Sequence, residues 1–121
     1  MTILALSGVR AASAHHSAAA VYDGVRLIDI PGTVREFSWR NPHCHVYIDV
    51  TDGPFKGQTY TVEMSSPGSL IEEGWTKTLL QAGDHVVVHV HPSLGGAPAG
   101  LCRRCTVTIN GTVTRPKVLL D

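Results

Sequence analysis

Seven histidines stand out in this chain of 121 residues, because histidine titrates near neutral pH and is a common metal ligand. His15 and His16 directly follow Ala12-Ser13-Ala14, which resembles the small-residue site cut by signal peptidase. Cleavage there would start the mature chain at His15. Its α-amino group and imidazole would then form a chelate suited to Cu(II). The equally weighted alternative is a solvated chain start that binds no metal.

A third candidate copper ligand is His43, which follows the Asn41-Pro42 turn at the start of a predicted strand. Alternatively, its ring satisfies backbone groups of that turn. The pairs His43/His45 and His89/His91 are secondary candidates, with zinc as the alternative metal. Residues two apart share a strand face at about 6–7 Å, so two rings can converge on one ion. The alternative, which we favour for these pairs, is that the histidines lie on a solvated strand face and bind no metal.

Three cysteines allow at most one disulfide and leave one free thiol. Cys102 and Cys105 have the spacing of a redox motif, but they lie where a strand is expected rather than at a helix start. They can form a local disulfide only if the chain turns at Arg103-Arg104. Alternatively, the two cysteines are inert thiols with no metal-binding or redox role. A mixed metal site with His89 or His91 is a further alternative.

The composition excludes several classes of function. Ten Lys and Arg balance ten Asp and Glu, so the chain lacks the basic field that carries nucleic-acid binding. No apolar run approaches the roughly 20 residues that span a bilayer. No Ser-His-Asp set, carboxylate pair or Gly-rich phosphate loop is evident, although Glu63 could act as a general base with His43 as proton shuttle. We therefore expect a non-catalytic protein.

The elements that position these residues are predicted from apolar alternation, which indicates strands over 25–39, 43–51, 58–64, 85–91, 101–110 and 112–119. The first strand changes its buried face near Arg35-Glu36, which is typical of a β-bulge. Ser65-Ser66-Pro67 begins a short helix. Three strands, a helix and two strands is the order of an OB-type barrel. We expect a mainly β, five- to six-stranded OB-like barrel with one short helix between strands three and four.

Such a barrel also separates some candidates. Its second and fourth strands both flank the first, so the two His-x-His pairs would lie roughly 10 Å apart. Trp39, Tyr47, Trp75 and Glu63 are candidates for a surface that binds a small ligand or a partner protein. We expect one of the two tryptophans to belong to the core. Cys44 faces the core by its parity and is expected to be an ordinary buried thiol.

An ordered series of short motifs runs along the chain: HHS at 15–17, GTVREFSW at 32–39, NPH at 41–43, EMSSP at 63–67, GW at 74–75 and AGDHV at 82–86. This series resembles the DUF6152 family of small exported bacterial proteins, whose function is not established. The resemblance implies export and a small β-barrel, and it implies no reaction. Cys44, His45 and the segment 102–105 lie outside the family pattern, so sites built from them would be particular to this protein.

Residues 1–14 are expected to be a truncated signal peptide, 15–24 an N-terminal arm and 25–121 a single β-barrel domain of a periplasmic or secreted protein. The favoured function is copper binding through His15 and His16, with His43. The competing function is an accessory or assembly domain that binds a partner protein or small ligand, with the histidines incidental. Metal binding would weaken below about pH 6 as imidazoles protonate. An interaction domain would instead use a strand edge or an aromatic patch.

Overall fold

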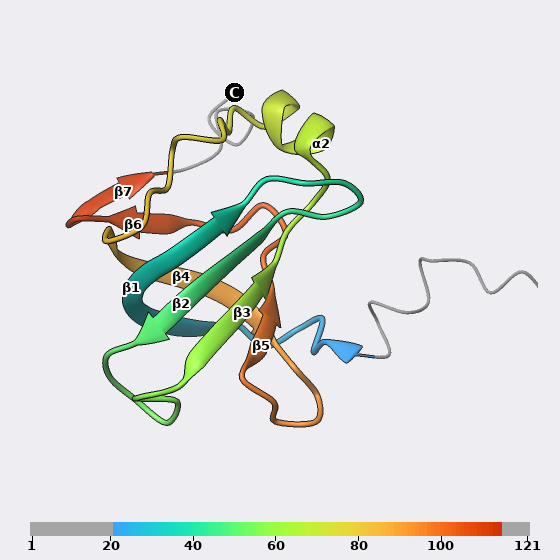
Figure 1. Cartoon of the computed structure of the whole chain (residues 1–121). Helices are drawn as coiled ribbons and strands as arrows, with labels where there is room; N and C mark the ends of the chain where they lie inside the picture. The colour runs from blue at the N-terminus through green and yellow to red at the C-terminus, as the bar shows by residue number, and fades with distance from the viewer. Residues whose placement is uncertain (1–20, 115–121) are drawn as a thin grey trace, which may run out of the picture.

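The computed structural model describes residues 21–114, which form seven strands and one short helix (Figure 1). The elements are β1 (Ile28–Ser38), β2 (His45–Val50), β3 (Thr59–Glu63), α2 (Pro67–Glu72), β4 (His85–Pro92), β5 (Ala99–Leu101), β6 (Val107–Ile109) and β7 (Thr112–Thr114). Within this range, no helix is long and apolar enough to cross a membrane. The predicted signal peptide, residues 1–14, and the first part of the predicted arm over 15–24, residues 15–20, lie outside the described residues.

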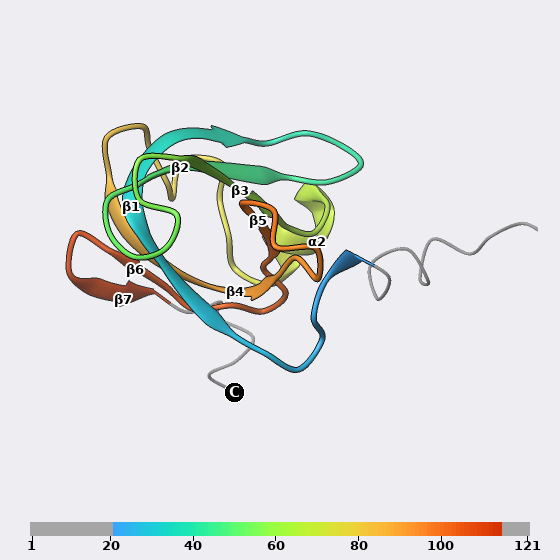
Figure 2. The ribbon, with the colours of Figure 1, turned by 90° about the horizontal axis from the view of Figure 1, so that it is seen from below.

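Five strands close into a barrel because β1 is long enough to pair on both sides. Its C-terminal part pairs antiparallel with β2, and its N-terminal part pairs antiparallel with β4. The remaining order is β2-β3-β5-β4, with β3 and β5 parallel. Seen from below, these strands surround the interior, and β6 and β7 lie outside the ring (Figure 2). The small, mainly β barrel with a helix between its third and fourth strands is therefore confirmed.

The predicted β-bulge in β1 is also confirmed. The pairing of β1 with β2 shifts register between Val34 and Glu36, so one residue of β1 has no direct partner. Val34 is buried before the shift, whereas Phe37 packs partly buried against the core after it. A bulge bends a strand and increases its twist, which is what one strand needs in order to contact neighbours on two sides of a barrel.

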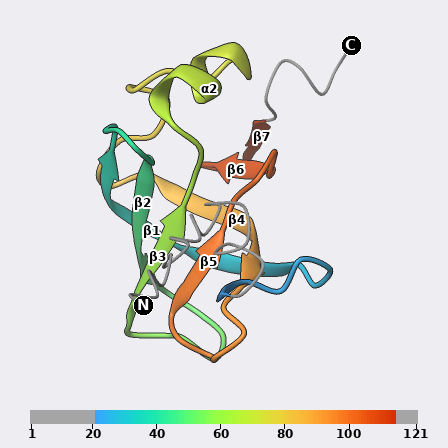
Figure 3. The ribbon, with the colours of Figure 1, turned by 90° about the vertical axis from the view of Figure 1, so that its right-hand side faces the viewer.

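The core consists of alternate residues from the strands, together with side chains from the segment around α2. Ser66 caps the helix by accepting from the backbone N–H of Ser69, and Pro67 occupies the first turn. The helix lies at one end of the barrel (Figure 3), where Leu70 and Trp75 are buried. The buried set is Ile30, Val34, Cys44, Val46, Ile48, Val50, Tyr60, Val62, Met64, Leu70, Trp75, Leu80, Val86, Val88, Val90, Cys102, Cys105 and Val107.

The prediction of one continuous strand over 101–110 is wrong, because the segment forms two strands, β5 and β6. Both pieces pair with β4: Leu101 lies opposite His91, and Val107 lies opposite Val88. Five residues, 102–106, therefore lie across from only two, 89–90. The extra residues of the segment 102–106 form a loop that projects from the barrel. Alternation gave the right strand type on both sides of this insertion but could not show the interruption.

The last two strands form a hairpin that extends the sheet beyond the barrel. The turn residues Asn110 and Gly111 have positive φ angles of 47° and 86°, as the Asn-Gly pair requires for a tight hairpin turn. β7 covers residues 112–114 of the strand expected over 112–119, and the residues beyond Thr114 lie outside the described part.

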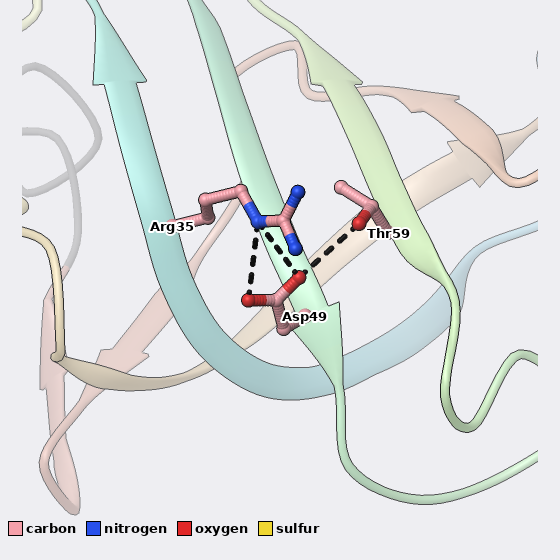
Figure 4. A network of polar contacts seen from close by, with 3 residues as sticks. All are labelled: Arg35, Asp49 and Thr59. Atoms are coloured by element: carbon pink, nitrogen blue, oxygen red, sulfur yellow. Dashed lines mark hydrogen bonds and ion pairs between the residues drawn. The ribbon is translucent and has the colours of Figure 1, made fainter.

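Polar contacts cross the outer face of the barrel. Asp49 on β2 accepts from Arg35 Nε on β1, with N–O distances of 3.1 and 3.3 Å, and from the Thr59 hydroxyl on β3 at 3.1 Å (Figure 4). The Arg35 and Asp49 side chains are 63% and 47% exposed, so solvent weakens this ion pair. The network links three adjacent strands at one level of the sheet.

Candidate functional site

The strongest polar cluster lies at the end of β2 and β3 nearest α2, and we call it the Glu63 cluster. It consists of Tyr22, His43, His45 and Glu63. His45 lies directly opposite Glu63 in the β2–β3 pairing. Side chains in such a pair project from the same face with Cβ atoms about 5 Å apart. The alternation that buries Val46 and Val62 thus exposes this cluster on the outside.

Glu63 is the centre of the cluster. The Tyr22 hydroxyl donates to Glu63 Oε2 at 2.9 Å, and His43 Nε2 lies 3.9 Å from Oε1. The Glu63 side chain is only 27% exposed. Burial and then the bond to Glu63 raise the pKa of Tyr22 from 10.0 to about 12. Arg35 pairs with Asp49 and not with Glu63.

Backbone contacts fix the position of Tyr22. Tyr22 forms an isolated antiparallel bridge with Ser93, just after β4. On either side, the Asp23 N–H donates to Pro92 O at 2.9 Å, and the Leu94 N–H donates to Val21 O at 2.8 Å. The N-terminal arm therefore joins the barrel beside the end of β4, and the Tyr22 side chain reaches Glu63 from there.

His43 lies two residues before β2 rather than on it, which corrects the strand start expected at residue 43. The next residue, Cys44, extends the pairing: its N–H donates to Ser65 O, and its carbonyl accepts from the Met64 N–H. These bonds hold the backbone beside His43 in register with the end of β3. The His43 side chain is 52% exposed, so its ring combines a fixed position with access from solvent.

The aromatic candidates divide between core and surface. Trp75 is 3% exposed and belongs to the core, so one of the two tryptophans is a core residue, as expected. Trp39 is half-buried and packs edge-on against Phe37, with ring centroids 5.6 Å apart. Tyr47 stacks with His45 on the outer face at 6.1 Å. Tyr47 and Glu63 thus share an outward sheet face, whereas Trp75 contributes no surface to it.

The second histidine pair lies on β4, away from the Glu63 cluster. β2 and β4 flank β1 on opposite sides, so the two His-x-His pairs do not meet in one site. His89 Nδ1 contacts the carboxylate of Asp29, and His91 Nδ1 donates to Arg26 O at 3.0 Å. In residues 21–114, no group of three or more His, Cys, Asp or Glu side chains is placed to hold a metal.

The cysteines have structural roles. Cys102 and Cys105 form a disulfide with a Cα–Cα distance of 5.1 Å, and the chain turns between them at Arg103 and Arg104, as the bridge requires. Cys44 is a free, buried thiol, and burial raises its pKa.

Sequence reasoning missed Tyr22, which lies outside every predicted strand and carries no periodic signal. The Tyr–Glu–His contact depends on pairing between segments about 20 to 40 residues apart, and composition cannot reveal that pairing. His15 and His16 lie outside the described residues. Within the described range, His43 and Glu63 offer two adjacent metal-ligating side chains, one imidazole and one carboxylate.

Searches of curated proteins and of solved structures found no match to this chain. The model of a family of unknown function, DUF6152, matches residues 4–104. That range includes the Glu63 cluster, all five strands of the barrel and the disulfide loop up to Arg104. The chain therefore belongs to the DUF6152 family.

Proposed function

We propose that the protein is exported and binds Cu(II) through His15 and His16 at its mature N-terminus, with His43 as a further ligand. The supporting observation is the contact chain from Tyr22 through Glu63 to His43. Through Tyr22, the arm that carries His15 and His16 is bonded to Glu63, and the Glu63 carboxylate lies beside His43. The family is of unknown function, so this proposal depends on the residues of the chain itself.

The length of the arm is compatible with such a site. His16 precedes Tyr22 by six residues, and six residues can span at most about 20 Å. The Tyr22 hydroxyl is 2.9 Å from one Glu63 oxygen, and His43 is 3.9 Å from the other. Nitrogen ligands from the arm are therefore within reach of the His43 ring.

The donor chemistry also fits copper. An α-amino group and imidazole rings are the ligands that Cu(II) prefers, and Cu(II) exceeds the other divalent first-row metals in affinity for such sites. The Glu63 carboxylate beside His43 would offset part of the charge of a bound cation. Zinc accepts the same donors and is the alternative metal. Because no three ligating side chains of residues 21–114 are placed to hold a metal, tight binding should require the arm.

A second candidate function is docking of a partner protein, with the histidines incidental. β7 is the outermost strand of the sheet, paired only with β6 in the described part of the chain. Val113 on this strand is 57% exposed. An edge strand with free backbone groups can accept a strand from another chain. This function would require no metal.

Copper titration of a chain that begins at His15 tests the proposal. We expect one Cu(II) per chain, nitrogen coupling in the electron paramagnetic resonance spectrum, and loss of binding below about pH 6 as imidazoles protonate. His43→Ala should weaken binding by about tenfold or more and reduce the nitrogen coupling. His85→Ala is the matched control, because His85 is an exposed histidine at the start of β4.

A chain with one extra residue before His15 tests the amine separately. It should lose the chelate while the barrel stays folded. If the extended chain or His43→Ala bound copper as tightly as the chain that begins at His15, the proposed ligand set would be contradicted.

A further inference from the structure

A hollow of about 240 Å³ lies on the outer side of β4, where the disulfide loop projects from the barrel. Its walls include Leu27, His89, His91, Leu101, Arg103 and Arg104. We propose that this hollow binds a small organic anion, whose acid group lies between Arg103 and Arg104 and whose apolar part lies on Leu27 and Leu101. The proposal is independent of copper binding, since it uses none of the same residues.

The insertion between β5 and β6 directs the two arginines outward. Cys102 and Cys105 are buried, at 4% and 7% exposure, and their disulfide closes a loop of four residues. Arg103 and Arg104, between them, are exposed. Arg104 has a φ of 50°, in the left-handed region that residues with a side chain adopt uncommonly. The short covalent ring restricts the backbone of the loop, and both arginines line the hollow.

The histidines of the hollow are oriented by neighbouring groups. Because a carbonyl oxygen only accepts, His91 must carry its proton on Nδ1, which donates to Arg26 O at 3.0 Å. His89 Nδ1 is turned toward the carboxylate of Asp29. Each ring is thus anchored through Nδ1, and its Nε2 can donate to an anion only when the ring is protonated.

The charges favour an anion over a metal ion. Arginine stays protonated in proteins, so two permanent positive charges stand beside His89 and His91 and oppose binding of a cation there. Two carboxylates near the histidines are already engaged: Asp29 contacts His89, and Asp23 accepts from backbone N–H groups. Guanidinium groups bind carboxylates and phosphates through paired hydrogen bonds. Two guanidinium groups at one hollow therefore suit an oxyanion.

The size and the apolar wall limit the ligand. The volume is below the roughly 300–1,000 Å³ typical of pockets for drug-sized ligands. Leu27 is 58% exposed, and Leu101 lies on β5 opposite His91, so an apolar surface adjoins the basic groups. A small molecule with one acid group beside an aromatic or aliphatic part satisfies both features.

Titration of the ¹⁵N-labelled oxidised protein with phenyl phosphate, benzoate, inorganic phosphate and benzyl alcohol tests this inference by NMR. Phenyl phosphate or benzoate should cause saturable shifts in residues 89–91 and 101–106. The two probes distinguish a phosphate ligand from a carboxylate ligand. Inorganic phosphate should bind more weakly because it has no apolar part, and neutral benzyl alcohol should not bind.

The variant Arg103→Gln/Arg104→Gln should weaken binding of the better probe by about tenfold per arginine, the usual effect of losing a charged hydrogen bond. Both residues are exposed, so the variant keeps its fold. Lys56→Gln/Lys77→Gln removes two exposed positive charges elsewhere and should bind normally. Absence of saturable shifts for both probes, or equal weakening in the two variants, would overturn the proposal.

Discussion

The hydroxyl of Tyr22 donates a hydrogen bond to Glu63 at 2.9 Å, although the two residues lie 41 positions apart in the sequence. This bond joins the N-terminal arm to the outer face of β3. Because His43 lies beside the same carboxylate, the bond also places the arm next to the ligand candidate that the barrel itself supplies. Copper binding by the arm together with His43, as proposed, depends on this arrangement.

Alkaline titration should detect the environment of Tyr22. Burial raises the pKa values of both Tyr22 and Tyr60 to about 12, and Tyr22 has the added effect of Glu63. Their folded-state pKa values exceed the ordinary 10.0, so both contribute stability below about pH 10 that is lost as the pH rises through about 12.

Tyr22→Phe should therefore remove one of two late-titrating tyrosines from the ultraviolet absorbance titration of the folded protein. Tyr47→Phe is the control and should leave both late transitions in place. Persistence of two late transitions in Tyr22→Phe would show that the phenol does not occupy the place described.

Closure of the barrel should be sensitive to one glycine on β5. A Cβ atom at Gly100 would lie 2.7 Å from Val90 Cγ2 and 2.8 Å from the Tyr60 hydroxyl, which donates to Ala99 O. Gly100→Ala should lower the free energy of unfolding by about 1–3 kcal/mol, as overpacking does. Gly68→Ala, on the helix with nothing within 4 Å, should be neutral or slightly stabilising. Urea unfolding of both variants checks the contrast, and equal stabilities would refute the close approach.

Reduction of the Cys102–Cys105 disulfide should destabilise the protein without unfolding it. The bridge closes only four residues, for which chain entropy predicts a loss of about 2 kcal/mol. Apart from Cys102 and Cys105, the buried core residues lie outside this loop. Urea unfolding with and without a reductant measures the change, with Cys44→Ala as the reference for effects of the third cysteine. A reduced protein without β-sheet circular dichroism would contradict this expectation.

Loss of the surface ion pair between Arg35 and Asp49 should change the stability of the protein only slightly. Arg35 and Asp49 are both substantially exposed, so Asp49→Asn should change the free energy of unfolding by less than about 1 kcal/mol. The Thr59 hydroxyl can still donate to the amide oxygen. A thermal melt of the variant checks this value, and a much larger loss would mean that the network controls the alignment of the three strands.

The sequence carried most information about the barrel where side chains alternate. Alternation identified the strands around Val46, Val62 and Val88, and the change of parity after Val34 located the bulge. It could not reveal the insertion at 102–106, because residues on both sides keep a strand pattern and pair with the same neighbour. Local patterns therefore predicted the elements, whereas an interruption within one strand appeared only through its pairing.

The candidate site was less predictable for a related reason. His43 was identified from its type and its place after a turn, and Glu63 from its outward parity on β3. Their closeness to each other and to Tyr22 arises from contacts between separate segments of the chain. Physical reasoning from one sequence can name such side chains, but it cannot bring them together without the topology.

The most direct test of the copper proposal is the intact mass and metal content of the protein isolated from the exported fraction of its native host. The account predicts a mass that begins at His15 and about one copper per chain, retained at neutral pH and released on acidification. A mass that retains Met1, or a chain that starts at His15 yet holds no copper even after loading, would contradict it.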